Sequence, residues 1–190
     1  MSYNRRRSEA LSDRLLEPQD SGPNRLKKET PNIHWRTAAF AGIAAGAVAT
    51  VFQIALWWIT AEPLTAILFR DSRLTAAIVM GRQVLPPPAT FDSTIMLVAA
   101  IVHLALSIAY GLALAAMISR LSALLSWPRS LLVGAAFGIA LYAVNMYGFT
   151  IAFPWFAMAR GWITAVTHAV FGIAAAAVYK EWTLQTVRIP

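Results

Sequence analysis

Cysteine is absent from this sequence, and charged residues are scarce. With no cysteine among its 190 residues, the chain can form no disulfide, thiolate metal site or cysteine nucleophile. Only 13% of the residues are charged, whereas about a quarter are charged in an average soluble domain. Proline and acidic residues are also missing from the interiors of the long apolar runs. These absences argue against a soluble fold.

The apolar residues, 58% of the chain, gather in four runs of about 20 to 25 residues. At about 1.5 Å per helical residue, each run crosses the roughly 30 Å hydrocarbon core of a bilayer. The runs lack the alternation of barrel strands, and only helices or closed barrels satisfy the backbone in lipid. The sequence therefore predicts an all-α, integral membrane four-helix up-down bundle in contact with the lipid bilayer. The predicted spans are about 36–60, 94–118, 130–153 and 161–180.

The ends of the chain are more polar than these runs. Residues 1–34 are predicted to be a cytoplasmic, largely disordered tail, because their mixed charges cannot bury enough apolar surface to fold. Residues 35–182 form the predicted transmembrane domain, and 183–190 a second cytoplasmic tail.

Basic residues predict the orientation. Twelve of the 16 Lys and Arg residues lie in the two ends and the 119–129 loop, and the other four lie in the two remaining loops. The positive-inside rule then places both termini of this multi-pass membrane protein in the cytoplasm. The net charge of +7 follows from this arrangement, and no recognition motif indicates a nucleic-acid partner.

One loop, residues 61–93, is long. Its apolar residues have helical spacing, which predicts an amphipathic helix over about 63–80, between Pro63 and Gly81. An interfacial anchor and a lid over the bundle are both open interpretations of this helix. Its acidic neighbours Glu62, Asp71 and Asp92 are interpreted as caps or solvated charges, so no acid–base pair indicates an enzyme.

Each predicted span carries one strongly polar residue on the face that holds its small residues. These residues are Gln53, His103, Asn145 and His168. All four lie about 7 to 9 residues from the predicted outer end, roughly 10–14 Å deep. Tyr110 and Tyr142 lie one or two turns deeper on the same faces. The pattern predicts a polar layer inside the bundle, since intramembrane polar residues usually face the interior.

Three interpretations of the polar layer are open. It can be hydrogen-bonding glue between helices. It can bind haem b or a metal through His103 and His168, although the cofactor, if any, is otherwise unknown. It can also serve a proton or small-solute pathway, since histidine titrates near neutral pH.

Several stretches resemble a known family. LFRDSRLTAAIVMGRQVLPPPATFD (68–92), HLALSIAYG (103–111), GAAFGIALYAVNMYGFTIAFPWFAMARGWIT (134–164) and HAVFGIAAAAVY (168–179) are similar to small bacterial inner-membrane proteins often labelled "sodium:proline symporter". The resemblance covers about residues 36–180. It implies the four-span fold and the membrane location, and it carries over no site residue.

The functional expectation is a non-enzymatic accessory or structural membrane protein. The first alternative is a small transporter or channel component for protons or a small solute. The second alternative is a haem b or metal-binding membrane subunit. A homo-oligomer or a larger membrane complex is the expected form of association.

Overall fold

A computed structural model describes residues 33–121 and 126–188, and side chains up to Thr183. The predicted tail over residues 1–34 lies almost wholly outside this range. Every regular element in the described residues is helical, and four helices are long and apolar enough to cross a membrane. The predicted all-α four-helix bundle is therefore confirmed, and the chain is a multi-pass membrane protein.

Shorter helical pieces lie between the first and second spans and between the third and fourth. The long helices are α2 (Trp35–Ile59), α4 (Ser93–Leu121), α5 (Trp127–Ala143) and α6 (Trp162–Arg188). The shorter elements are α3 (Leu64–Met80), η1 (Arg82–Val84), η3 (Val144–Gly148), η4 (Phe149–Ile151) and η5 (Pro154–Ala159). The third span comprises α5, η3 and η4 and ends at Ile151. The fourth helix continues beyond residue 180, where the predicted span ends.

Local sequence explains several helix ends. The Asp92 carboxylate accepts hydrogen bonds from the backbone N–H groups of Thr94 and Ile95, at 2.9 and 3.0 Å. This is the capping role expected of an acidic residue at a helix start. Gly81 ends α3 with a φ of 85°, a conformation that suits glycine because it has no Cβ.

Glycines set the closest approaches between helices. A Cβ added at Gly42 on α2 would overlap the Ser107 carbonyl of α4, and one at Gly111 would lie 2.6 Å from the Ala38 carbonyl oxygen. On α5, a Cβ at Gly138 would overlap the His168 carbonyl of α6. Small residues thus let the backbones of two helix pairs, α2–α4 and α5–α6, touch. Gly161 has open space around it, so it takes no part in this packing.

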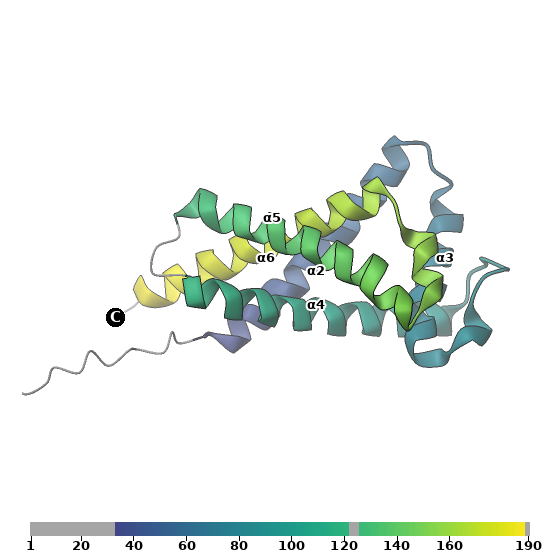
Figure 1. Cartoon of the computed structure of the whole chain (residues 1–190), viewed down its shortest axis with the longest axis horizontal. Helices are drawn as coiled ribbons and strands as arrows, with labels where there is room; N and C mark the ends of the chain where they lie inside the picture. The colour runs from purple at the N-terminus through teal and green to yellow at the C-terminus, as the bar shows by residue number, and fades with distance from the viewer. Residues whose placement is uncertain (1–32, 122–125, 189–190) are drawn as a thin grey trace, which may run out of the picture. The chain divides into compact units, whose positions relative to one another are not determined.

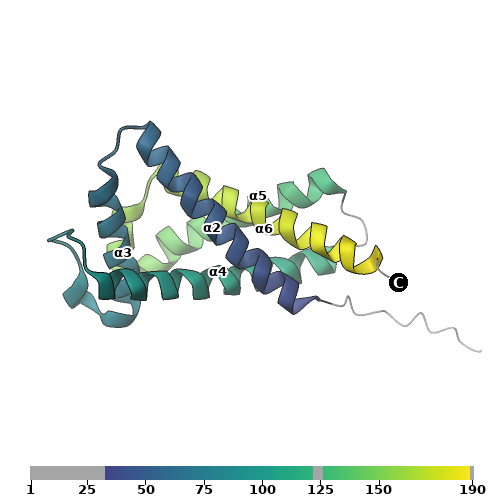
Figure 2. The ribbon, with the colours of Figure 1, turned by 180° about the vertical axis from the view of Figure 1, so that it is seen from behind.

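The core between these pairs is rich in alanine. It contains buried Ala residues of α2, α4 and α6 together with larger side chains such as Leu114 and Phe171. Helices α2 and α4 cross and diverge toward α3 (Figure 2). Helix α3 runs across the ends of the long helices instead of along them (Figure 1). We call this the α3 end of the bundle.

The predicted loop helix is present as α3, but its amphipathic character is not confirmed. Its buried residues include Arg73 as well as Leu74, Ala76 and Ala77. A charged side chain on the inner face blurs the separation between an apolar and a polar side. Whether α3 also lies in the lipid interface stays a prediction.

Candidate intramembrane binding cavity

The bundle is hollow near the α3 end. A cavity of about 390 Å³ lies there, and its wall includes side chains from α2, α3, α4, α6 and the η3–η5 segment. Along α4 the wall residues are spaced by three and four positions, from Met96 to Tyr110, so one helical face points into the cavity. The volume falls within the roughly 300–1,000 Å³ of small-molecule sites.

Five of the six predicted polar residues line this cavity. They are Gln53, His103, Tyr110, Asn145 and His168. Tyr142 is not in the cavity wall. Its ring instead packs edge-on against His168 and Tyr147, with centroids 5.8 and 6.0 Å apart.

Three of these side chains form one hydrogen-bonded chain. The Tyr110 hydroxyl donates to Asn145 Oδ1 at 2.7 Å, and Asn145 Nδ2 lies 3.2 Å from His168 Nε2. His168 Nδ1 lies 2.7 Å from the Thr164 carbonyl oxygen. A carbonyl can only accept, so Nδ1 carries the proton and Nε2 accepts from Asn145. These hydrogen bonds therefore hold His168 as a neutral imidazole with its proton on Nδ1.

His103 and Gln53 are less constrained. His103 Nε2 lies 3.3 Å from Thr50 Oγ1, and that hydroxyl also donates to the Gly46 carbonyl at 2.9 Å. Gln53 has no hydrogen-bond partner among the described residues, although it lines the cavity. Gln53 is therefore free to bind something in the cavity, whereas His103 is held by its contact to Thr50.

Thr167 is a wall residue that sequence reasoning missed. Its side chain is 6% exposed, and its hydroxyl has no hydrogen-bond partner in the described part of the chain. An unpaired hydroxyl in an apolar setting is unfavourable by about 1–3 kcal/mol. Neighbouring atoms cover the hydroxyl oxygen, so Thr167 adds an unfavourable polar group to this wall without presenting it to a ligand.

Asp71 is a second wall residue, and the interpretation of it as a cap or solvated charge does not fit its position. It projects from α3 into the cavity wall, and its side chain is 23% exposed. Its Oδ1 accepts a 2.8 Å hydrogen bond from Arg70 Nε. Burial raises the pKa of Asp71 above its usual 3.8, and the Arg70 contact opposes that shift. The sequence alone does not indicate that Asp71 lines a cavity, because the cavity forms only where α3 crosses the bundle.

A π-helical turn positions Asn145. The segment Val144–Gly148 interrupts α5 at the level of the polar chain, and such turns are frequent at functional sites. Arg160 stabilises the turn: its Nε donates to the Met146 carbonyl at 2.8 Å, and its guanidinium lies 4.4 Å from the centroid of the Tyr147 ring.

Two side chains attach α3 to the rest of the bundle. Arg73 donates to the carbonyls of Val84 and Thr90 at 3.2 and 3.1 Å. The Trp155 indole donates to the Leu74 carbonyl at 2.9 Å. Helix α3 is therefore held to its own loop and to η5 as a roof over the cavity.

The arrangement of the histidines does not favour haem ligation. Both ring nitrogens of His168 are engaged, so its Nε2 could reach an iron only if Asn145 moved away. No cluster of three metal-binding side chains occurs in residues 33–121 and 126–188. The polar groups are better suited to hydrogen-bonding a small molecule than to holding a metal.

Comparison with known proteins leaves the function to be argued from the site. No family model, curated protein or solved structure matches this chain.

Proposed function

We propose that this protein is a non-enzymatic membrane protein whose intramembrane cavity binds a small solute, as a small transporter or channel component does. The observation that supports this over a purely structural role is the cavity itself. Helices in a membrane associate through close packing, and this partly open pocket forgoes such packing. A structural bundle gains nothing from a pocket lined by Gln53, a polar side chain with no hydrogen-bond partner among the described residues.

A proton wire is less well supported. The hydrogen-bonded chain contains the Asn145 amide between Tyr110 and His168. An amide nitrogen does not titrate near neutral pH and so passes protons poorly. The polar chain is better explained as a scaffold that shapes one wall of the cavity.

The proposal includes the membrane orientation expected from the basic residues and the inner-membrane location expected from the family resemblance. Both termini then lie in the cytoplasm, and the α3 end faces outward. A reporter fused to the C-terminus and active only in the cytoplasm tests this. Activity of the converse reporter, which works only outside, would reverse the orientation.

Equilibrium dialysis of the purified full chain tests the binding function. The probes are three water-soluble benzene derivatives of similar size: the cation benzyltrimethylammonium, neutral N,N-dimethylbenzamide and the anion phenylacetate. At least one should bind at one site per chain, above an empty-micelle control. The matched variant Ala100→Leu adds bulk to the cavity wall and should abolish that binding. If the wild type binds none of the three, the accessory or structural role is the better account.

A further inference from the structure

Among the described residues, the cavity wall has a negatively charged side chain and no positively charged one. Asp71 lines it, whereas none of the described Lys and Arg residues does. The buried Arg73 guanidinium is directed to Val84 and Thr90 in the loop, and that of Arg160 to Met146 and Thr150. An anionic ligand would therefore meet a carboxylate and no cation.

The Asp71 carboxylate can accept another partner. Its contact with Arg70 joins one nitrogen to one oxygen, at 2.8 Å, between adjacent residues. The other carboxylate oxygen has no hydrogen-bond partner in the described residues. The Arg70 side chain is 33% exposed and outside the cavity wall, so water can solvate it when a ligand cation takes its place.

The remainder of the wall is suited to a cation with an apolar body. Five aromatic side chains line it: Trp57, Tyr110, Phe149, Phe156 and Phe171. Aromatic faces attract cations, and the attraction is strongest in desolvated sites. Most of the remaining wall is aliphatic, which would cover the apolar part of a ligand.

The two imidazoles do not oppose a cation in this arrangement. His168 is neutral because its Nδ1 donates to Thr164 and its Nε2 accepts from Asn145. His103 has a weak contact to Thr50, and no acidic side chain in residues 33–121 and 126–183 pairs with its ring.

We propose that the cavity binds a small organic cation, an aromatic or alkyl ammonium compound, with Asp71 as its counter-ion. This inference rests on the proposed solute-binding function and names the ligand class. Asp71 supplies the charge, the aromatic side chains contact the ammonium and its substituents, and Gln53 provides hydrogen bonds for further polar groups.

The three dialysis probes also test the ligand class. Benzyltrimethylammonium should bind at least about tenfold more tightly than N,N-dimethylbenzamide, because the Asp71 carboxylate and the aromatic faces attract its positive charge and have no such attraction for a neutral amide. Phenylacetate should bind most weakly. Equal binding of the three probes would overturn the cation inference while leaving the binding function in place, whereas binding of none would contradict the binding function itself.

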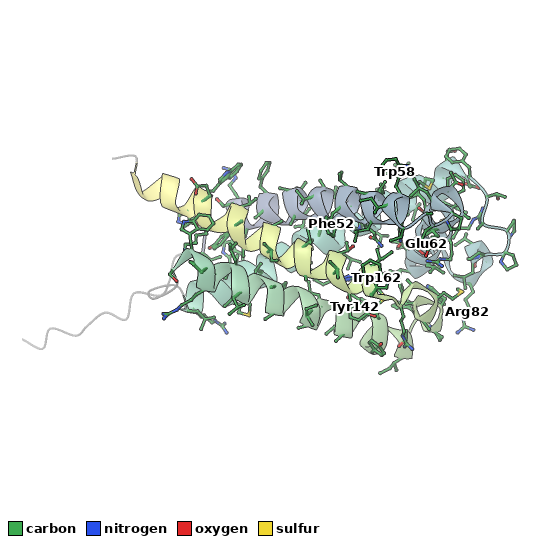
Figure 3. The ribbon with its side chains drawn as sticks, turned by 90° about the horizontal axis from the view of Figure 1, so that it is seen from above. Phe52, Trp58, Glu62, Arg82, Tyr142 and Trp162 are labelled. Carbon is green, nitrogen blue, oxygen red and sulfur yellow. The ribbon has the colours of Figure 1, made fainter. Side chains whose placement is uncertain are left out.

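Substitutions locate the counter-ion. Asp71→Asn should weaken benzyltrimethylammonium binding about tenfold and leave binding of N,N-dimethylbenzamide unchanged. Asp71→Glu should retain the cation preference. The control Glu62→Gln removes the same charge from an exposed residue at the α3 end (Figure 3) and should have no effect. An unchanged cation preference in Asp71→Asn would overturn the role of Asp71, and so would equal losses in both control and test variants.

An ammonium group can belong to a free organic compound or to a lipid headgroup. Dialysis in maltoside micelles with and without phosphatidylethanolamine distinguishes these sources. Unchanged affinity for benzyltrimethylammonium supports a free cation, and competitive loss of affinity supports the headgroup. If the lipid instead increased the binding of phenylacetate above that of the cation, the ammonium assignment would be wrong.

Discussion

The two ends of this bundle pack in opposite ways. In the half farther from α3, glycines such as Gly42 and Gly111 bring helix backbones into contact, and Ala38, Ala45 and Ala115 are fully buried. Toward α3 the same helices carry larger polar and aromatic side chains, and they surround a cavity of about 390 Å³. We call these regions the packed half and the hollow half.

The difference shows how close contacts between helices in one half of a bundle can open a cavity in the other half. Two helices that touch at glycine and cross must separate on either side of the contact. The helices that touch at Gly42 and Gly138 diverge toward α3, which runs across their ends (Figures 1 and 2). The tight backbone contacts are therefore concentrated in one half of the bundle, and the cavity lies in the other.

The largest difference in stability between the two halves should come from a substitution that pushes apart two helices of the packed half. Gly138→Ala should destabilise the protein by about 3 kcal/mol, the upper end of the usual overpacking range, because the new Cβ meets the His168 backbone. Unfolding in mixed detergent micelles measures the loss. The control Gly161→Ala introduces a Cβ into open space and should be nearly neutral. Similar losses for both variants would contradict the crossing geometry.

The same enlargement in each half should have opposite effects. Ala115→Leu, at a fully buried position of α4, should destabilise the protein by about 2 kcal/mol through overpacking. Ala100→Leu, in the cavity wall of the same helix, should be neutral or stabilising because it fills empty space. Thermal unfolding of both variants in detergent compares them. Equal destabilisation would mean that the hollow half is not hollow.

Within the hollow half, the loss of a hydroxyl group that forms a hydrogen bond should change the stability differently from the loss of one that forms none. Tyr110→Phe removes the donor to Asn145 and should be destabilising by about 0.6 kcal/mol, the average for hydrogen bonds between membrane helices. Thr167→Val removes a hydroxyl that has no partner in the described residues, so it should be neutral or stabilising. The two unfolding free energies are the readout, and a larger loss for Thr167→Val would refute the assignment.

The smallest expected effect is a pH dependence from Asp71. Its pKa in the folded protein is raised above 3.8 by burial. The folded state therefore favours the protonated form, and this contribution to stability is present below pH 3.8 and lost as the pH rises through the folded-state pKa. Melting temperatures on both sides of pH 3.8 should show a small decline with pH in the wild type, compared with a flatter profile in Asp71→Asn. A melting temperature that rises with pH would indicate that the Arg70 contact, which lowers the pKa of Asp71, has a larger effect than burial, which raises it.

The fold was largely predictable because each span depends on its own hydropathy. Gln53, His103, Asn145 and His168 could be selected because each is the strongly polar residue of its apolar run. The position of Asp71 in the cavity wall could not be predicted, since it depends on α3 crossing the bundle. The position of Thr167 in the cavity wall could not be predicted either, because a single hydroxyl group is ordinary in a membrane helix. The π-helical turn at Asn145 has no proline or charge to mark it.

Cysteine labelling tests the account most directly, because the chain has no native cysteine and each introduced thiol is unique. Three positions on α4 are compared in lipid: Ala100 in the cavity wall, Leu104 on an exposed apolar face outside it, and Ala115 in the packed half. A small, water-soluble methanethiosulfonate should label Ala100→Cys rapidly, and benzyltrimethylammonium should slow that reaction, while Leu104→Cys and Ala115→Cys should react slowly. Labelling of Ala100→Cys no faster than Ala115→Cys would contradict the existence of an accessible cavity.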